Sequence, residues 1–256
     1  MGAMSKALVI VPCFNEERRL RADEVLRLIS AEKVDVLLVD DGSIDGTASL
    51  LREISAQAPA RVRALILERH DGKAEAVRRG LQQGLASGYE IVGFLDADFS
   101  PLALEWLRLL GVLRATGMRV VLGSRVRRAG AQVERLAVRH VVGRIFATAV
   151  SITLEHPFYD TQCGAKVFLD TPALRRALAT PFQSRWVFDV ELLSRLLNGP
   201  DALAFGDFVE VPLLRWRDVG GSKLRLRSML RAGIDLARFK VDRNKRRRGS
   251  TRAVAA

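Results

Sequence analysis

The alternation of short apolar runs with helical segments in the N-terminal half constrains the fold of this chain more than any other feature. Each run is bounded by polar residues, as a buried parallel strand would be, and the runs are Ala7–Cys13, Val34–Val39, Val62–Leu67 and Ile91–Leu95. Segments with helical spacing follow them, the first running from Asn15, a natural N-cap, to about Ser30, and the next two over Ala48–Ala56 and Ala74–Ala86. Repeated strand-then-helix units predict an α/β fold with a doubly wound, mostly parallel sheet.

Polar side chains follow the end of each of the four runs: Asn15 and Glu16, Asp40 and Asp41, Asp71 and Lys73, and Asp96 and Asp98. Ligands of a doubly wound sheet bind outside the carboxyl ends of its strands, where these clusters would meet. Each cluster taken singly is also ordinary turn or cap chemistry. The Gly-x-Gly-x-x-Gly and Gly-x-x-x-x-Gly-Lys-Ser/Thr patterns are missing, which disfavours an NAD enzyme and a P-loop NTPase.

The Asp96-Ala97-Asp98 segment places two carboxylates two residues apart directly after a predicted strand. This spacing lets both reach one divalent cation, and hard oxygen ligands suit Mg²⁺ or Mn²⁺. Mg²⁺ is usually held by one or two carboxylates together with substrate phosphates. The segment therefore predicts a site for a nucleoside diphosphate and its cation, although an Asp-x-Asp also arises by chance in a chain of this length.

The composition is that of one globular domain, with 48% hydrophobic and 27% charged residues. We expect residues 1–4 to be an expression remnant, residues 5–222 to form the domain, and residues 223–256 to form a basic amphipathic helix and a disordered tail. The longest apolar stretch of the second half, Ile145–Leu154, is too short to cross a bilayer. Two cysteines predict free thiols in a reducing cytosol.

Basic residues are concentrated at the C-terminus and predict an anionic partner. The formal net charge is +12, and residues 223–248 hold eleven Lys and Arg against two Asp. Two stretches combine basic residues with an apolar stripe at helical spacing. One stripe, with arginines beside it, is Val138, Val141, Val142, Ile145, Ala149 and Ile152, and the other, in the basic C-terminal segment, is Leu226, Met229, Leu230, Ile234 and Ala237. Such stripes are typical of helices on an anionic membrane surface, but also of helices that face their own core.

Several motifs resemble family 2 inverting glycosyltransferases with the GT-A fold. The N-terminal ones are Val11–Glu17, Val39–Thr47, Asp71–Lys73 and Asp96–Asp98. Further motifs look like the polyprenyl-phosphate (dolichyl-phosphate) glucosyltransferase branch: Gly123–Arg125, Asp160–Lys166, Phe188–Glu191, and Trp216 with Gly221–Lys223. The resemblance covers roughly residues 7 to 235 and implies a GT-A domain.

The resemblance also implies roles for individual residues. The donor nucleotide would be bound by Pro12, Phe14, Glu16, Asp40, Lys73, Asp96, Ala97 and Asp98, with Asp96 and Asp98 holding Mg²⁺ or Mn²⁺. The acceptor phosphate would be bound by Ser124, Arg125, Arg139 and Lys223. The residues predicted to take part in catalysis are Asp96, Asp98, Arg125, Asp160 and Asp189. Whether Asp160, Asp189 or Glu191 orients the acceptor, holds sugar hydroxyls or acts as a base stays open, and Asp189 and Glu191 suit the first turn of a helix equally well.

The predicted function is transfer of a sugar from a UDP-sugar, glucose or an N-acetylhexosamine, to a polyprenyl phosphate at the cytoplasmic membrane face. The enzyme would be peripherally associated there with an anionic membrane surface, and a separate membrane-anchoring protein is a further conceivable partner. Alternatives are a GDP-mannose-dependent mannosyltransferase and a soluble glycosyltransferase with a small acceptor. A nucleic-acid-binding protein is disfavoured because the basic tail lacks interleaved aromatic residues for base stacking.

Overall fold

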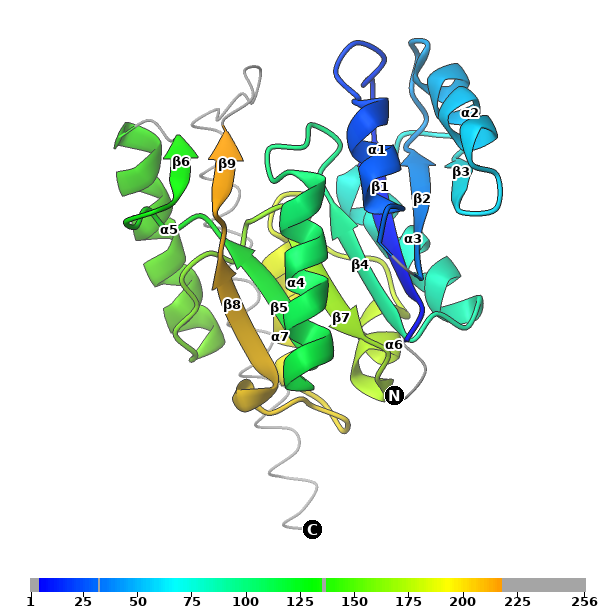
Figure 1. The fold of residues 1–256 in the computed structure, drawn as a ribbon. Coiled ribbons are helices and arrows are strands. Elements are labelled where there is room, and N and C mark those ends of the chain that lie inside the picture. Colours follow the sequence, from blue (N-terminus) through cyan, green and yellow to red (C-terminus); the bar gives the residue numbers. More distant parts are fainter. Residues whose placement is uncertain (1–4, 32, 135–136, 218–256) are drawn as a thin grey trace.

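A seven-stranded sheet forms the centre of the protein in a computed structural model that describes residues 5–31, 33–134 and 137–217 (Figure 1). The strand order is β3-β2-β1-β4-β7-β5-β8. The strands are β1 (Ala7–Cys13), β2 (Val34–Asp40), β3 (Val62–Ile66), β4 (Ile91–Leu95), β5 (Val120–Ser124), β7 (Ala165–Leu169) and β8 (Phe208–Pro212). Strand β7 runs antiparallel to β4 and β5, and the other neighbouring pairs are parallel. A small second sheet pairs β6 (Gln132–Glu134) with β9 (Arg215–Arg217).

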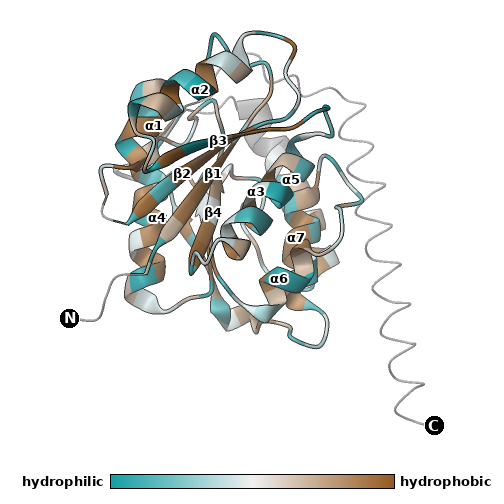
Figure 2. Ribbon diagram, turned by 90° about the vertical axis from the view of Figure 1, so that its right-hand side faces the viewer, coloured by the Kyte–Doolittle hydropathy of each residue, from teal (hydrophilic) through white to brown (hydrophobic). Residues whose placement is uncertain are grey.

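Helices cover both faces of the large sheet (Figure 2). One layer consists of α1 (Ala22–Leu28), α2 (Thr47–Gln57) and α4 (Ala103–Thr116). The other consists of α3 (Lys73–Ala86), α5 (Ala137–Leu154), α6 (Pro172–Leu178) and α7 (Phe188–Leu197), and a short 3₁₀ helix spans Phe205–Asp207. This arrangement confirms the predicted doubly wound, mostly parallel α/β fold.

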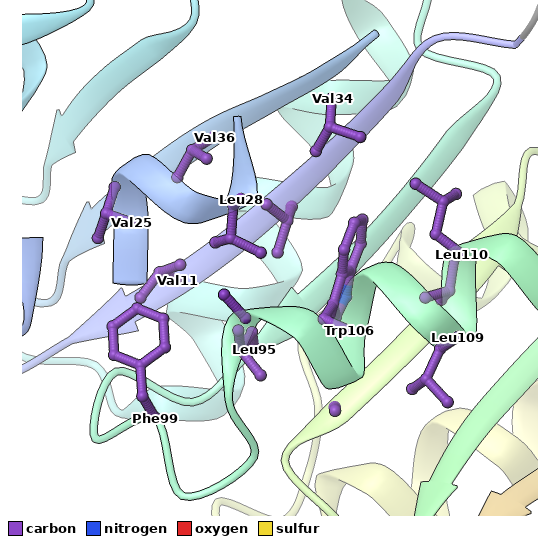
Figure 3. Packing of buried hydrophobic residues seen from close by; sticks show 14 of the residues in the cluster. Val11, Val25, Leu28, Val34, Val36, Leu95, Phe99, Trp106, Leu109 and Leu110 are labelled. Carbon is purple, nitrogen blue, oxygen red and sulfur yellow. The ribbon is translucent and has the colours of Figure 1, made fainter. Parts of the chain in front are cut away.

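Alternate residues of the central strands enter two separate hydrophobic cores. In β1, Leu8 and Ile10 join the core beneath α3, whereas Val9 and Val11 join the core beneath α1 and α4. Every residue of β1 is buried, which explains why this strand is an unbroken apolar run in the sequence. Figure 3 shows the second core, in which Trp106 of α4 lies among Leu28, Leu109 and Leu110.

The Trp106 side chain also fixes how closely α4 approaches the sheet. Its indole N–H donates to the main-chain oxygen of Lys166, at 3.1 Å, by passing over Gly93 of β4. A Cβ at Gly93 would lie 2.9 Å from the indole ring and 2.3 Å from that oxygen. Glycine is therefore required there for close packing.

The segment after β1 differs from the prediction. The expected helix from Asn15 begins only at Ala22, and Arg21 occupies the N-cap position. Asn15 instead has a left-handed backbone, with φ 55°, and its side-chain oxygen accepts the N–H of Ile44. The Asn side chain tolerates this conformation and here joins the loops that follow β1 and β2.

Candidate active site

The carboxyl ends of β1, β2, β4 and β5 share one edge of the large sheet (Figure 1). Because β7 is antiparallel to β4 and β5, its beginning lies at the same edge, and it brings the residues 160–164 that precede it. Sequence segments separated by well over a hundred residues therefore meet at the place where ligands of such sheets bind.

The Asp96-Ala97-Asp98 segment forms a tight turn at this edge. The turn is closed by a 3.0 Å hydrogen bond from the N–H of Phe99 to the main-chain oxygen of Asp96, and Asp98 Oδ1 accepts the N–H of Ser100 at 2.9 Å. Phe99 adopts a left-handed φ of 48°, an unfavourable conformation for an aromatic residue. Its ring is buried in the core with Val11 and Leu95, which holds the turn in place (Figure 3).

Two carboxylates and one ammonium group dominate the electrostatics of the turn. Lys73 Nζ, at the start of α3, lies 2.5 Å from Asp96 Oδ1. Burial and the neighbouring Asp96 carboxylate raise the pKa of Asp98 above its ordinary value. Burial alone would lower the pKa of Lys73, but the carboxylates of Asp96 and Asp189 outweigh it and raise that pKa.

The turn offers a divalent cation two carboxylates. Within the described residues there is no group of three or more His, Cys, Asp or Glu side chains that could hold a metal. A pair of hard oxygen ligands, completed by substrate phosphates, fits the way Mg²⁺ is usually bound in nucleotide sites. Asp96 and Asp98 would hold the ion, and Lys73, paired with Asp96, would add a positive charge beside the substrate phosphates.

Gly164 packs directly against the Asp96 carboxylate. A Cβ on this glycine would lie 2.2 Å from Asp96 Cγ, and the main-chain oxygen of Gly164 accepts the N–H of Asp96 at 2.9 Å. The loop before β7 thus helps to position the Asp96 carboxylate, in addition to the turn that contains this residue. Sequence reasoning placed Gly164 in a family motif but gave it no role, because its contact with Asp96 arises only from the insertion of β7.

The residues predicted to bind the donor nucleoside surround the ends of β1 and β2. Phe14 is partly exposed, and its ring stacks on His70 with a centroid distance of 3.8 Å. Glu16 is buried and accepts two hydrogen bonds from Arg19, at 2.6 and 2.9 Å. Pro12 lies within β1, where it is buried. His70 follows β3, and its stacking on Phe14 brings the loop after β3 next to these residues.

Asp40 has one oxygen available for a ligand. Its Oδ1 accepts hydrogen bonds from the N–H and the hydroxyl of Ser43, whereas its buried Oδ2 has no hydrogen-bond partner within the described part of the chain. A buried acceptor without a partner is costly unless a ligand supplies a donor. The neighbouring Asp41 has a structural role instead, since it accepts the N–H groups of Asp71 and Gly72.

The Arg125 guanidinium, predicted to grip the acceptor phosphate, is held by Asp160. Its Nε and Nη2 donate to the two oxygens of that carboxylate at 2.7 and 2.8 Å. Burial alone would lower the pKa of Arg125, but Asp160 raises it above its ordinary value. Glu210 fixes the loop from the other side by accepting the N–H groups of Tyr159 and Asp160. Asp160 therefore orients Arg125, and the neighbouring Ser124 has a buried Oγ without a hydrogen-bond partner in the described residues.

Asp189 forms a buried ion pair that the sequence did not predict. Lys166 of β7 is fully buried, and its ammonium donates to Asp189 Oδ1 and to the main-chain oxygen of Cys163, both at 2.6 Å. Glu191, two residues further, accepts the N–H groups of Gln183 and Ser184 and so shapes the turn before α7. The side chain of Arg139, the residue Lys223 and the motif 221–223 lie outside the described residues.

Comparisons with known proteins agree with this architecture. The model of Glycosyl transferase family 2 matches residues 8–173. A dolichyl-phosphate beta-glucosyltransferase of Drosophila melanogaster is 32% identical, with 89% of this chain and 72% of that protein covered. A polyprenol monophosphomannose synthase of Mycolicibacterium smegmatis is 29% identical, with 92% and 85% covered. The crystal structure of glucosyl-3-phosphoglycerate synthase from Mycobacterium tuberculosis with Mn²⁺, UDP and glucosyl-3-phosphoglycerate has a TM-score of 0.61 and 21% identity, with 93% and 80% covered. The last comparison concerns the fold.

Proposed function

Because the chain belongs to glycosyl transferase family 2 and is therefore a glycosyltransferase, we propose that it transfers a sugar from a UDP-sugar, glucose or an N-acetylhexosamine, to a polyprenyl phosphate. The main support for a nucleotide-sugar donor is the pair of Asp96 and Asp98 beside Lys73 at the carboxyl edge of the sheet. The acceptor is inferred from relatives named dolichyl-phosphate beta-glucosyltransferase. The product would be a polyprenyl-phospho-sugar with inverted configuration at the anomeric carbon.

The site residues suit each part of this reaction. An oxygen of the acceptor phosphate would attack the anomeric carbon while the bond from that carbon to the diphosphate oxygen breaks and its electron pair leaves with the nucleotide. Lys73 and a Mg²⁺ or Mn²⁺ ion held by Asp96 and Asp98 would stabilise the charge that grows on the diphosphate. The acceptor phosphate is already mostly ionised at neutral pH, so the reaction needs no general base. Asp160 would then act by orienting Arg125. Asp189, which is paired with Lys166, would keep the nearby Lys73 protonated.

The membrane-bound nature of such an acceptor leads us to propose that the enzyme is peripherally associated with the cytoplasmic face of the membrane. Among the described residues, no helix is both long and apolar enough to span a bilayer. The α5 stripe predicted from the sequence faces outward where it is described, since Ile145 and Ile152 are 67% and 59% exposed and Ala149 is also exposed. The GT-A domain at 5–222, the basic segment 223–256 and a separate anchoring protein remain parts of this proposal.

A mannosyl donor is the second candidate, because one relative is named a polyprenol monophosphomannose synthase. Both candidates share the acceptor and the carboxylate pair, and they differ in the nucleotide and the sugar. A panel of labelled UDP- and GDP-sugars therefore separates them.

The first experiment is transfer of label from that panel to a polyprenyl phosphate in detergent, with Mg²⁺, with Mn²⁺ and with EDTA. We expect transfer from one donor that EDTA abolishes and that Asp98→Ala lowers roughly a hundredfold or more. Asp201→Ala, which changes a half-exposed carboxylate outside the site, is the matched control and should keep full activity. Donor hydrolysis without any lipid product would overturn the lipid acceptor and favour a small soluble one.

A further inference from the structure

The turn that leads into α7, residues 183–187, has a rigidly held backbone. Glu191 accepts the N–H groups of Gln183 and Ser184, at 2.9 and 3.2 Å, and is itself held by Arg195 at 2.6 Å. The buried hydroxyl of Ser184 accepts the N–H groups of Trp186 and Val187, at 3.3 and 3.1 Å. The turn therefore has a defined conformation relative to α7.

Two large side chains project from this fixed turn into solvent. Arg185 is exposed, and the structure gives it no hydrogen-bond or ion-pair partner among the described residues. Trp186 is 50% exposed, whereas Trp106 and Trp216, the other two tryptophans of the chain, are buried. An uncommitted guanidinium next to an exposed indole is a combination that binds an anionic group with an apolar neighbour.

The turn borders the candidate active site. Arg185 Cδ lies 3.5 Å from the position that a Cβ would take on Gly72, the residue directly before Lys73. Phe188, at the start of α7, has its ring centre 6.0 Å from Lys73 Nζ. Arg185 therefore lies next to the residues that we assign to the diphosphate.

The other cations of the site are already paired within the protein. Lys73 is paired with Asp96, Arg125 with Asp160, and Lys166 with Asp189. An additional phosphate that enters the site could bind the Arg185 guanidinium without breaking an ion pair within the protein. The planar fork of arginine matches two phosphate oxygens at once.

We propose that Arg185 binds the phosphate of the acceptor and that Trp186 packs against the isoprenoid units next to that phosphate. This inference rests on the proposed function and adds residues to its acceptor side that the sequence did not indicate. The donor diphosphate is the other source of phosphate oxygens near Gly72. The exposed indole favours the acceptor, because the acceptor phosphate is joined directly to an apolar chain and the donor diphosphate is not.

The test measures binding of farnesyl phosphate, a short isoprenoid phosphate, to the full chain in the absence of donor. Binding is followed by tryptophan fluorescence, and we expect the signal to come mainly from Trp186 because the other two tryptophans are buried. We expect Arg185→Ala to weaken this binding roughly ten- to a hundredfold, to leave binding of farnesol unchanged, and to raise the KM of the acceptor but not of the donor in turnover. Arg185→Lys should restore part of the affinity. Arg52→Ala, which removes an exposed arginine on α2 that has no ion-pair partner among the described residues, is the matched control and should bind normally.

The outcomes separate this inference from the proposed function. Equal binding of farnesyl phosphate by Arg185→Ala and the unchanged protein, with lipid transfer intact, would overturn the inference alone. A raised donor KM with an unchanged acceptor KM would also overturn it and assign Arg185 to the diphosphate. An unchanged protein that neither binds nor glycosylates isoprenoid phosphates would overturn both.

Discussion

Gly164 offers a test of the carboxylate pair that leaves both carboxylates in the protein. In Gly164→Ala the new Cβ would lie 2.2 Å from Asp96 Cγ, so the Asp96 carboxylate must move away from Lys73 and Asp98. We expect transfer activity to fall roughly ten- to a hundredfold, because catalytic groups displaced by about 1 Å lose that much. Activity and thermal unfolding of the variant are the measurements.

Gly111→Ala is the control for this substitution. Gly111 lies on the exposed side of α4, where a Cβ would meet no atom within 4 Å, so the change should stabilise the helix by about 0.5–1 kcal/mol and leave activity unaltered. Full activity in Gly164→Ala would contradict the proposed role of Asp96.

For individual residues, the sequence indicates which charged side chains lie at the site, but not which of them form ion pairs with one another. Asp96, Asp98 and Lys73 could be predicted because each follows directly on a strand or begins a helix. The Arg125 and Asp160 pair joins residues 35 positions apart, and Lys166 looks like one polar residue in a strand. Such pairs depend on strand order, which local patterns do not specify.

The ion pair between Lys166 and Asp189 links strand β7 to helix α7 through the core. Lys166→Met removes the cation that is hydrogen-bonded to the buried Asp189 carboxylate, so it should destabilise the fold by about 3–5 kcal/mol. Replacing both, in Lys166→Met with Asp189→Leu, should recover most of that loss because no charge then stays buried. Urea unfolding of the two variants and the unchanged protein measures both effects. A double variant as unstable as the single one would show that the pair does not act as a unit.

The elements themselves differ in how far they could be predicted. The first four strands are apolar runs of strand length between polar segments, and the structure confirms them to within one residue at each end. Helix α1 starts six residues later than expected, with Arg21 instead of Asn15 as its N-cap, because Asn15 turns its side chain to the loop after β2. The antiparallel direction of β7 could not be predicted, because the five residues of this strand do not show which way it runs in the sheet.

The outward apolar face of α5 bears on how the whole molecule meets its surroundings. Ile145 and Ile152 lie on the exposed side of this helix, whereas Val150 and Leu154 on the other side are buried. We expect Ile145→Glu with Ile152→Glu to weaken binding to anionic lipid vesicles roughly ten- to a hundredfold in a flotation assay, since two apolar side chains can no longer enter the interface. The fold should be unaffected.

Leu104→Glu is the matched control for this experiment. Leu104 is a similarly exposed apolar residue at the start of α4, in the helix layer on the opposite face of the sheet (Figure 2). This substitution should leave vesicle binding unchanged. Equal losses in both proteins, or no loss in either, would contradict an α5 face that contacts the membrane.

The position of β7 between β4 and β5 also affects the order in which the protein can be completed during synthesis. Residues up to Ser124 contain five strands, yet within the described residues β5 pairs with β7 and β8 alone, and β7 begins at Ala165. A nascent chain that has released these five strands from the ribosome therefore exposes β4 as an open edge. Gly164 reaches Asp96 only when β7 fills that edge. Nucleotide binding should therefore appear late in translation, and a chaperone that shields the β4 edge would protect this intermediate.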